Sequence, residues 1–263
     1  MINRQTALFG IGDPNEKTFM SSVCDKAEKS IFSGRAVFSK FLSPREVNMV
    51  SERITQFVDV RFFGGYAQSE RCVAAFCGTD GNADEIAPDY MFPVQAVTIK
   101  TNNKTVYSHK DYLGALMSLG ITRELLGDIV ILENEAVLFC LPEICEFLKN
   151  NLTKVANTGV TVSEADIFNI NIPERKYEII HKTAASARLD CIVGACTNKS
   201  RSVSAQLVER GLVNVNYVPV KNTSHIVKDG DIISVRGFGK MLIEIGEGLS
   251  KRGKIKITVK QYI

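Results

Sequence analysis

The chain has 263 residues, more than one typical domain contains, so two or three folding units are expected. Hydrophobic residues make up 45% of it, which is enough for buried cores and excludes wholesale disorder. The net charge is +3, no apolar run approaches the roughly 20 residues that cross a bilayer, and the first residues lack the plan of a secretory signal.

The first part of the chain, residues 1–72, is predicted to be a helical segment. Apolar residues recur at three- and four-residue spacing over residues 21–32 and 43–58. Ser43 and Glu46 have the spacing of a capping box, with a proline between them at the first helical position. These features mark the beginning of the second helix.

The pattern changes after Val60, and residues 73–164 are predicted to form a small α+β sandwich, an antiparallel sheet with helices on one side. Residues 165–180 are expected to be a linker, because Pro173 breaks any helix there, although short β pairing is also open. We expect strands at 73–76, 96–100, 128–132 and 136–141, a hairpin turn at 133–135, and helices at 110–119 and 143–155.

A stretch rich in glycine, aromatic residues and arginine precedes the first of these strands. Two glycines let backbone N–H groups approach a ligand closely, while a tyrosine can stack on a base and arginines can meet phosphate. The alternative is a tight turn at the glycines with Phe62 and Phe63 in the core. Together with two residues at the next helix start, the candidate second site comprises Arg61, Gly64, Gly65, Tyr66, Arg71, His109 and Lys110.

The C-terminal part, residues 181–263, has its own order of elements. A first helix is expected to begin within residues 187–190, and a second to run from the hydroxyl cluster at residues 200–202 to Gly211. Strands are expected at 212–216 and 231–235, the second after an Asp-Gly turn. This order resembles the S4-type RNA-binding domain, with one departure at Tyr217, where that family usually has glycine.

Charge is divided unevenly along the chain. Residues 174–263 hold 16 Lys and Arg against 8 Asp and Glu, a net +8, and residues 1–173 hold 16 against 21, a net −5. Such a cationic module favours salt-dependent binding to a polyanion, and a basic face kept only for solubility is the alternative. The expected RNA contacts are Arg188, Lys199, Ser200, Arg201, Ser204, Arg210, Asn214, Asn216, Lys221, Arg236 and Lys240.

The last basic stretch, residues 251–256, alternates basic and apolar residues like a strand. Two interpretations are open for it. It is either an edge strand guarded by lysines, or a further contact with RNA.

Three motifs extend the resemblance over most of the chain. They are Gly64-Gly65-Tyr66 with Glu70-Arg71, His109-Lys110-Asp111 with Leu113-Gly114-Ala115-Leu116, and Gly127-Asp128-Ile129. In this order before an S4-type module, they are similar to the YlmH-like family of bacterial proteins. The resemblance implies an α+β chain with a helical N-terminal segment, an RNA-recognition-like middle domain and a C-terminal S4-type domain.

The same resemblance implies a cytoplasmic protein that binds ribosomal RNA of the large subunit, and also tRNA. The family is linked to the rescue of stalled large subunits that still hold peptidyl-tRNA. Its genes often lie near cell-division genes, so a cell-division protein is an alternative partner. We therefore expect a non-catalytic RNA-binding protein, with a cell-division accessory protein as one alternative.

An RNA-modifying enzyme is the other alternative, because Arg188-Leu189-Asp190 matches a tripeptide of pseudouridine synthases whose aspartate attacks uridine. Here the tripeptide opens a helix of the module itself, so Asp190 is interpreted as a helix-terminal acid. His109 and Asp111 lie two apart on a helix and do not face each other, so they are interpreted as part of a helix cap. Seven cysteines without a Cys-x-x-Cys pair, and three scattered histidines, indicate free thiols in a reducing cytosol, with no metal and no cofactor.

Overall fold

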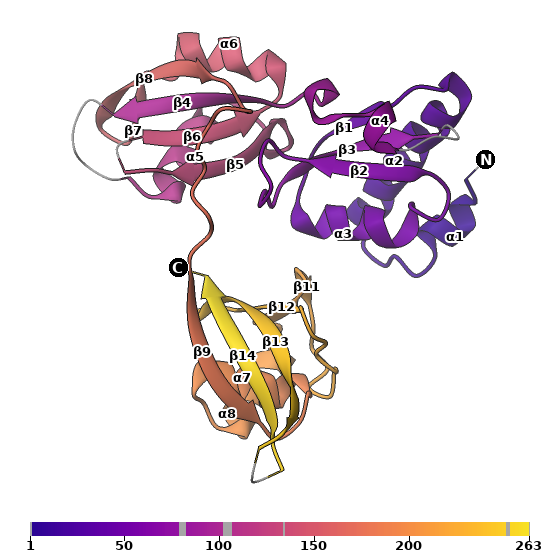
Figure 1. Cartoon of the computed structure of the whole chain (residues 1–263), viewed down its shortest axis with the longest axis vertical. Coiled ribbons are helices and arrows are strands. Elements are labelled where there is room, and N and C mark those ends of the chain that lie inside the picture. Colours follow the sequence, from indigo (N-terminus) through magenta and orange to yellow (C-terminus); the bar gives the residue numbers. More distant parts are fainter. Residues whose placement is uncertain (1, 79–82, 102–106, 134, 251–252, 263) are drawn as a thin grey trace. The chain divides into compact units, whose positions relative to one another are not determined.

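The computed structural model describes residues 2–78, 83–101, 107–133, 135–250 and 253–262 of the chain. They form two compact units, Met1–Pro173 and Glu174–Ile263, both built from helices and antiparallel strands (Figure 1). The α+β fold class expected from the sequence is therefore confirmed. Among the described residues, every hydrophobic core cluster lies within one unit, so each unit buries its own apolar side chains.

The N-terminal part of the first unit contains the expected helices. Ser43 caps the third helix as predicted: its hydroxyl accepts from the Glu46 N–H at 3.3 Å, and its own N–H donates to the Glu46 carboxylate at 2.6 Å. A three-stranded sheet accompanies the helices, so this segment is not helical alone. The elements are α1 (Arg4–Leu8), α2 (Pro14–Ser33), α3 (Pro44–Arg53), and strands β1 (Val37–Leu42), β3 (Cys72–Cys77) and β2 (Asp59–Phe63), in that sheet order.

A five-stranded sheet forms the second half of this unit. Its order is β5 (Leu126–Ile131), β6 (Glu135–Cys140), β4 (Gln95–Thr101), β8 (Thr158–Ala165) and β7 (Lys154–Val155). The helices α5 (His109–Ser118) and α6 (Pro142–Asn151) pack on one face, and the short helices α4 (Ala83–Ile86), η1 (Asp89–Met91) and η2 (Arg123–Leu125) lie in the connections. The predicted antiparallel sheet with helices on one side is thus present.

One sequence expectation for this region needs correction, whereas another is confirmed. The helix expected at 143–155 ends at Asn151, because Leu152 leaves the helical conformation and the next residues pair with β8. The hairpin expected at 133–135 does join β5 and β6, although Asn134 lies outside the described residues.

The two sheets of the first unit share a core. Val73 and Ala75 of β3 and Phe41 of β1 belong to one buried cluster with Val137 and Phe139 of β6. The expected boundary between residues 72 and 73 falls at the start of β3, which pairs with both β1 and β2. Because a boundary there would separate β3 from its own partners, we propose that the N-terminal part continues past β3.

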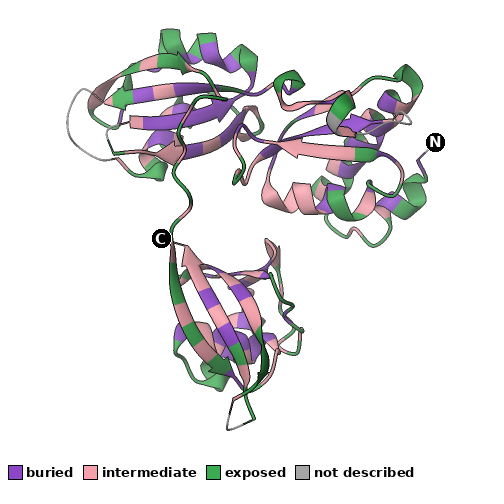
Figure 2. Cartoon of the chain, in the orientation of Figure 1, coloured by how far each residue is buried: buried purple, intermediate pink, exposed green. Residues whose placement is uncertain are grey.

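The second unit is a six-stranded sheet with both helices on one face (Figure 1). Buried residues alternate with residues of intermediate exposure along its strands, as the purple and pink stripes of Figure 2 show. This alternation means that one face holds the core and the other is turned outward. The elements are β9 (Tyr177–Ala184), α7 (Leu189–Thr197), α8 (Arg201–Glu209), β10 (Val213–Val215), β11 (Val218–Pro219), β12 (Ile232–Val235), β13 (Gly239–Leu249) and β14 (Ile255–Tyr262).

The strand order corrects the interpretation of the basic tail as a guarded edge. It runs β11-β10-β12-β13-β14-β9, so β14 is an interior strand that pairs with β13 and β9. Within the tail, residues 251–252 lie outside the described residues. The expected linker at 165–180 includes the first residues of β9, and the division between the two units falls inside it, after Pro173.

Candidate nucleic-acid interface

The most organised polar group in the second unit is centred on Asp190, in the first turn of α7. Arg188 donates two parallel hydrogen bonds to its carboxylate, from Nε to Oδ1 at 3.1 Å and from Nη2 to Oδ2 at 3.0 Å. Arg201, at the beginning of α8, donates from Nε to the same Oδ2 at 3.0 Å. One carboxylate therefore fixes the guanidinium groups of two separate helix starts.

The carboxylate at the centre of this arrangement is buried, whereas one of the two arginines is exposed. The Asp190 side chain is only 4% exposed, whereas Arg201 keeps 65% of its side-chain surface in solvent. Hydrogen bonds from Arg188, and then from Arg201, lower the pKa of Asp190 to about 2, against the opposing effect of burial. The carboxylate is therefore ionised at neutral pH and holds both arginines, and Arg201, which is bound through Nε, turns its outer N–H groups to solvent.

Lys199 and Ser200 lie directly before α8 and are exposed, as expected for residues that contact a ligand. The Ser200 hydroxyl accepts from the Val203 N–H at 3.4 Å and so caps the helix. Ser204 does not fit the prediction: it is fully buried, and its hydroxyl donates to the Ser200 carbonyl at 3.0 Å. Its role is to tie the first turn of α8 to its cap.

Asn216 is also used inside the module. Its side-chain amide donates to Asp231 at 2.8 Å, and its side-chain carbonyl accepts from the Ile232 N–H at 2.9 Å. Asn216 and Tyr217 both have positive φ, 48° and 66°, and they join β10 to β11 in a two-residue hairpin loop. Such a loop favours glycine at its second position, which explains why the family usually has one there.

The remaining predicted RNA contacts lie on different faces of the second unit. Asn214 lies between the buried Val213 and Val215, so its side chain points away from the helices. Lys240 precedes the buried Met241 and also lies on the outward face of the sheet. The three other exposed cations are in loops and at a helix end: Arg210, Lys221 and Arg236.

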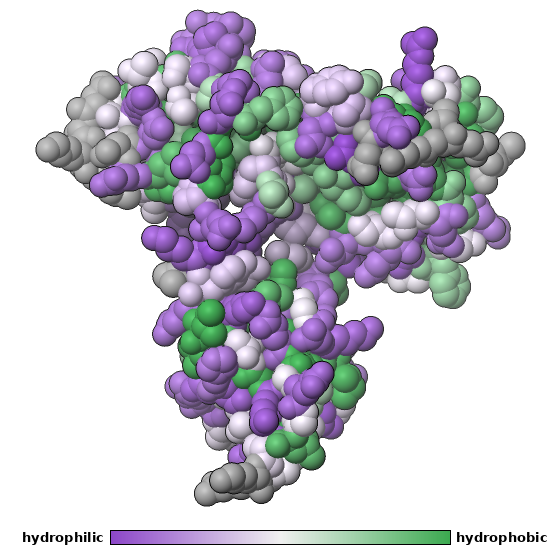
Figure 3. All heavy atoms as spheres, viewed as in Figure 1, coloured by the Kyte–Doolittle hydropathy of each residue, from purple (hydrophilic) through white to green (hydrophobic). Residues whose placement is uncertain are grey.

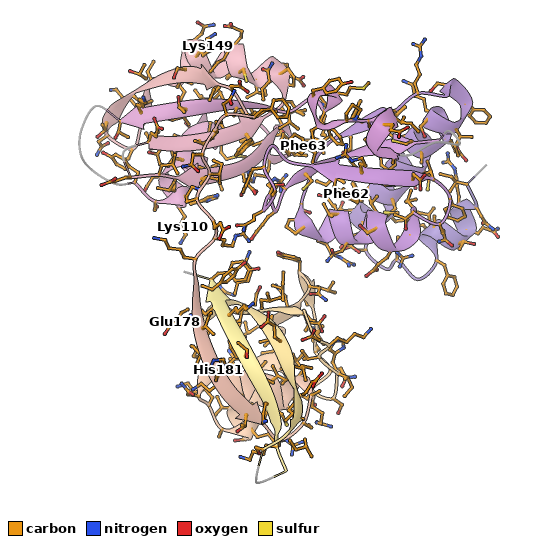
Figure 4. The ribbon with its side chains drawn as sticks, in the orientation of Figure 1. Phe62, Phe63, Lys110, Lys149, Glu178 and His181 are labelled. Atoms are coloured by element: carbon orange, nitrogen blue, oxygen red, sulfur yellow. The ribbon has the colours of Figure 1, made fainter. Side chains whose placement is uncertain are left out.

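Most residues of the candidate second site in the first unit make packing contacts inside the protein. Gly65 has φ of 100°, and a Cβ there would lie 2.2 Å from the Phe139 ring; one on Gly64 would lie 2.3 Å from the Arg71 carbonyl oxygen. Gly65 is required because the turn after β2 approaches β6 closely, and Gly64 because the turn folds back on Ser69 and Arg71. Figure 4 labels Phe62 and Phe63 at the end of β2, where both are half-buried against core clusters.

Asp128 joins two of the sequence motifs in space. Its carboxylate accepts from the Tyr66 hydroxyl at 2.9 Å, the Glu70 N–H at 2.7 Å and the Arg71 N–H at 3.2 Å. The Tyr66 ring stacks on Phe139, with centroids 5.1 Å apart and planes at 24°. The motif thus closes the joint between the two sheets, in agreement with the tight-turn alternative.

The two arginines of this motif have internal partners as well. Arg71 donates to the carbonyls of Leu126 at 2.8 Å, Arg123 at 3.0 Å and Phe41 at 3.3 Å, and its burial lowers its pKa. Arg61 donates to the Ala87 carbonyl and forms an ion pair with Asp89 at 2.7 Å. Both side chains hold connecting segments in place.

His109 and Lys110 are the exposed members of the candidate second site, at the beginning of α5. Figure 4 labels Lys110. Asp111 caps this helix, because its carboxylate accepts from the Ser108 N–H at 2.8 Å and hydroxyl at 2.7 Å. Burial, and then the charge of Arg123, lower the pKa of His109, which favours its neutral form. His109 and Asp111 thus have separate roles.

Other kinds of site find less support in the structure. No three His, Cys, Asp or Glu side chains among the described residues are grouped so that they could hold a metal ion. Within the same part of the chain, no helix is both long and apolar enough to span a bilayer.

The second unit contains an RNA-binding module of the S4 class, because a family model described as "S4 domain" matches residues 198–233. Two further models match the chain: "YlmH, N-terminal" over residues 15–80 of the first unit, and "Putative RNA-binding domain in YlmH" over residues 88–182, which extends into the start of the second unit. The chain belongs to the YlmH family. None of the three descriptions names a catalytic activity.

Two known proteins are similar to this chain. The "Ribosome-associated protein quality control protein P2" of Bacillus subtilis (strain 168) is 34% identical over 233 residues, which are 85% of this chain and 86% of that relative. The solved structure "Cell division protein ylmH from Streptococcus pneumoniae" has a TM-score of 0.50 at 18% identity and covers 62% of this chain and 99% of its own. The second comparison shows similarity of fold.

Sequence reasoning missed the organising role of Asp190 and the contribution of Ser224, whose hydroxyl accepts from Arg188 at 2.7 Å. No sequence pattern indicated Ser224, since the loop that brings it to Arg188 is placed by tertiary packing.

Proposed function

We propose that the chain binds ribosomal RNA of the large subunit and acts in ribosome-associated quality control, on particles that retain peptidyl-tRNA. The observation that carries the proposal is the pair of arginines fixed by Asp190, next to Lys199 and Ser200 at the start of α8. Membership in the YlmH family and the name of the Bacillus relative support it. A protein with this function works in the cytoplasm.

The physical basis is preorganised contact with phosphate. A guanidinium group whose inner nitrogens are held by Asp190 presents its outer N–H groups in a fixed direction and loses little rotamer freedom on binding. The free N–H groups at the start of α8 and the Lys199 ammonium add further positive potential at the same place. Structured RNA offers closely spaced phosphates, so this surface recognises shape and backbone.

A second contact through the first unit is part of this proposal. His109 and Lys110 are exposed at the start of α5 and are positioned to meet phosphate or ribose of a second RNA element, such as tRNA. Two modest contacts on one particle reinforce each other, because binding of one raises the effective concentration of the other.

Sedimentation with purified large ribosomal subunits tests the main contact. Replacing Lys199 and Arg201 by glutamate (K199E/R201E) should abolish co-sedimentation at moderate salt, because two phosphate contacts become repulsive. The wild-type complex should weaken as salt rises. The matched control K17E/K29E makes the same charge change on α2, where both lysines are exposed, and should leave sedimentation nearly unchanged.

Sedimentation of K199E/R201E equal to that of the wild type would count against the assignment. Treatment with ribonuclease distinguishes binding to RNA from binding to a protein partner. If cellular complexes of the protein persist after the RNA is degraded, a protein partner holds them, and the RNA-binding proposal is wrong for those complexes.

A further inference from the structure

The face of the second unit's sheet opposite α7 and α8 carries an aromatic and cationic group that the proposed RNA contact does not use. Tyr177 of β9 and Tyr262 of β14 meet edge to face, with ring centroids 5.1 Å apart. Lys240 of β13 places its Nζ 4.3 Å from the Tyr262 centroid and 5.7 Å from that of Tyr217. Arg175 lies over Tyr262, with Cζ 5.2 Å from the centroid.

These side chains are on the outward face and partly accessible to solvent. Ile257 and Val259 of β14 are buried, so by alternation Tyr262 points to the opposite side. Tyr177, Tyr217, Tyr262 and Lys240 all retain intermediate exposure. Ile179, two residues after Tyr177 on the same side of β9, is 59% exposed, which shows that this part of the sheet is not covered within the second unit.

The same face continues into a groove. An open depression of about 640 Å³ is lined by residues of β9, β13 and β14, among them His181, Thr183, Lys256 and Thr258. His181 pairs with Thr258 across the strands, four residues before Tyr262 along β14. At about 3.4 Å per residue, the groove begins roughly 14 Å from the tyrosines, which leaves space for more than one nucleotide.

We propose that this outward face, called here the open sheet face, binds unpaired RNA nucleotides, with the tyrosines stacking on bases and the cations meeting phosphates. The inference rests on the proposed RNA-binding function and adds a second contact on the other side of the same module. Its charges favour this occupant: Arg175, Lys240, Lys256 and Lys260 are basic, against Glu244, which is paired with Lys260, and Glu247, which lines the groove. Aromatic rings beside cations on an exposed sheet are the usual platform for single strands.

The test uses the full chain and a fluorescein-labelled oligouridine of about 12 nucleotides, because uridine runs form little structure of their own. Fluorescence anisotropy gives the dissociation constant. The variant Y177L/Y262L keeps apolar bulk but loses the ring faces, and should bind about fivefold or more weakly, the loss of one stacked base. Y177F/Y262F keeps the rings and should stay within about twofold of the wild type.

Y90L is the matched control, because Tyr90 of the first unit is 76% exposed and lies outside the open sheet face. It should bind oligouridine like the wild type. Unchanged binding by Y177L/Y262L would overturn the inference and leave the face open to another occupant, such as a protein. Sedimentation of K199E/R201E tests the proposed function independently, so the two failures are distinguishable.

A second measurement decides the matter even if the leucine variant fails to fold. The wild-type protein is crosslinked by ultraviolet light to a 4-thiouridine-containing RNA, and the modified peptides are identified by mass spectrometry. Crosslinks on Tyr177 or Tyr262 would support the inference. Crosslinks confined to other peptides would overturn it.

Discussion

At the scale of single residues, Asp190 decides how the basic surface is presented. A carboxylate that is 4% exposed accepts hydrogen bonds from two arginines that begin different helices. Removing it would raise the net positive charge, yet it would also release both guanidinium groups. Charge and geometry therefore predict opposite effects on RNA affinity, which makes this position informative.

We expect D190N to weaken binding to large ribosomal subunits severalfold, although it makes the protein more cationic. The reason is that the amide has one accepting oxygen where the carboxylate has two, and no charge, so Arg188 and Arg201 are held less firmly before they meet phosphate. The control E209Q removes one negative charge from the exposed surface of α8 without touching these arginines, and should bind at least as well as the wild type. Tighter binding by D190N would show that charge alone matters.

The D190N variant also tests how the free energy of unfolding depends on pH. The pKa of Asp190 is lowered to about 2, below its usual value, so its stabilising effect is present above pH 4 and is lost as pH falls towards 2. Chemical denaturation at pH 7 should show D190N less stable than the wild type by about 2 kcal/mol. The difference should shrink between pH 4 and pH 2, and a constant difference would contradict the ionised pairing.

Tyr217 stands where the family usually has glycine, and the hairpin between β10 and β11 still forms. Its φ of 66° is a left-handed conformation that costs a side chain about 1–2 kcal/mol. The hairpin forms nevertheless, because Asn216 is fixed through its side-chain bonds to Asp231 and Ile232. The tyrosine also contributes its ring to the open sheet face, next to Lys240.

At the scale of elements, the joint between the two sheets of the first unit depends on one turn. The turn after β2 packs on Phe139 of β6. The Asp128 carboxylate of β5 accepts hydrogen bonds from one hydroxyl and two backbone N–H groups of this turn. Arg71 then connects the turn to carbonyls on both sides of the joint. The sequence motif is therefore explained by packing and hydrogen bonding.

We expect G65A to destabilise the first unit by about 2–4 kcal/mol, because the new Cβ would overlap the Phe139 ring and the backbone has positive φ. The matched control is G114A in α5, where a Cβ meets nothing within 4 Å. Alanine is the better helix former, so G114A should be neutral or stabilise by up to about 1 kcal/mol. Urea denaturation of both variants checks this, and equal stabilities would refute the close approach at Gly65.

At the scale of the whole molecule, charge and cores are divided at the same place. The net charge is −5 over residues 1–173 and +8 over residues 174–263. The described core clusters respect this division, since three lie in the first unit and one in the second. Figure 3 shows that the surface turned to the viewer is mixed in hydropathy over both units, with hydrophilic side chains between apolar ones.

A chain that ends at Pro173 should therefore fold, because it keeps its three core clusters complete. It should show a cooperative thermal transition by circular dichroism, while its sedimentation with large subunits should fall to near background. Loss of the cooperative transition would contradict the division into units. Full retention of sedimentation would assign the main RNA contact to the first unit instead.

Local signals predicted much of the fold and a part of the site. The capping box of Ser43 and the Ser200 cap of α8 depend on residues close in sequence, so they could be predicted directly. Strand β1, between α2 and α3, and strand β2, between α3 and β3, were missed. The interior position of β14 was also missed, since pairing with β9 joins residues more than seventy positions apart.

The sequence by itself determined the order of elements, the cationic C-terminal module and its membership in an RNA-binding class, because caps, periodicity and charge are local properties. Only the tertiary structure decided which polar residues remain available. Arg71, Ser204 and Asn216 turn inward to internal partners, Arg201 stays outward on Asp190, and three tyrosines gather on one face of a sheet. Such choices depend on contacts between distant segments, which no local pattern encodes.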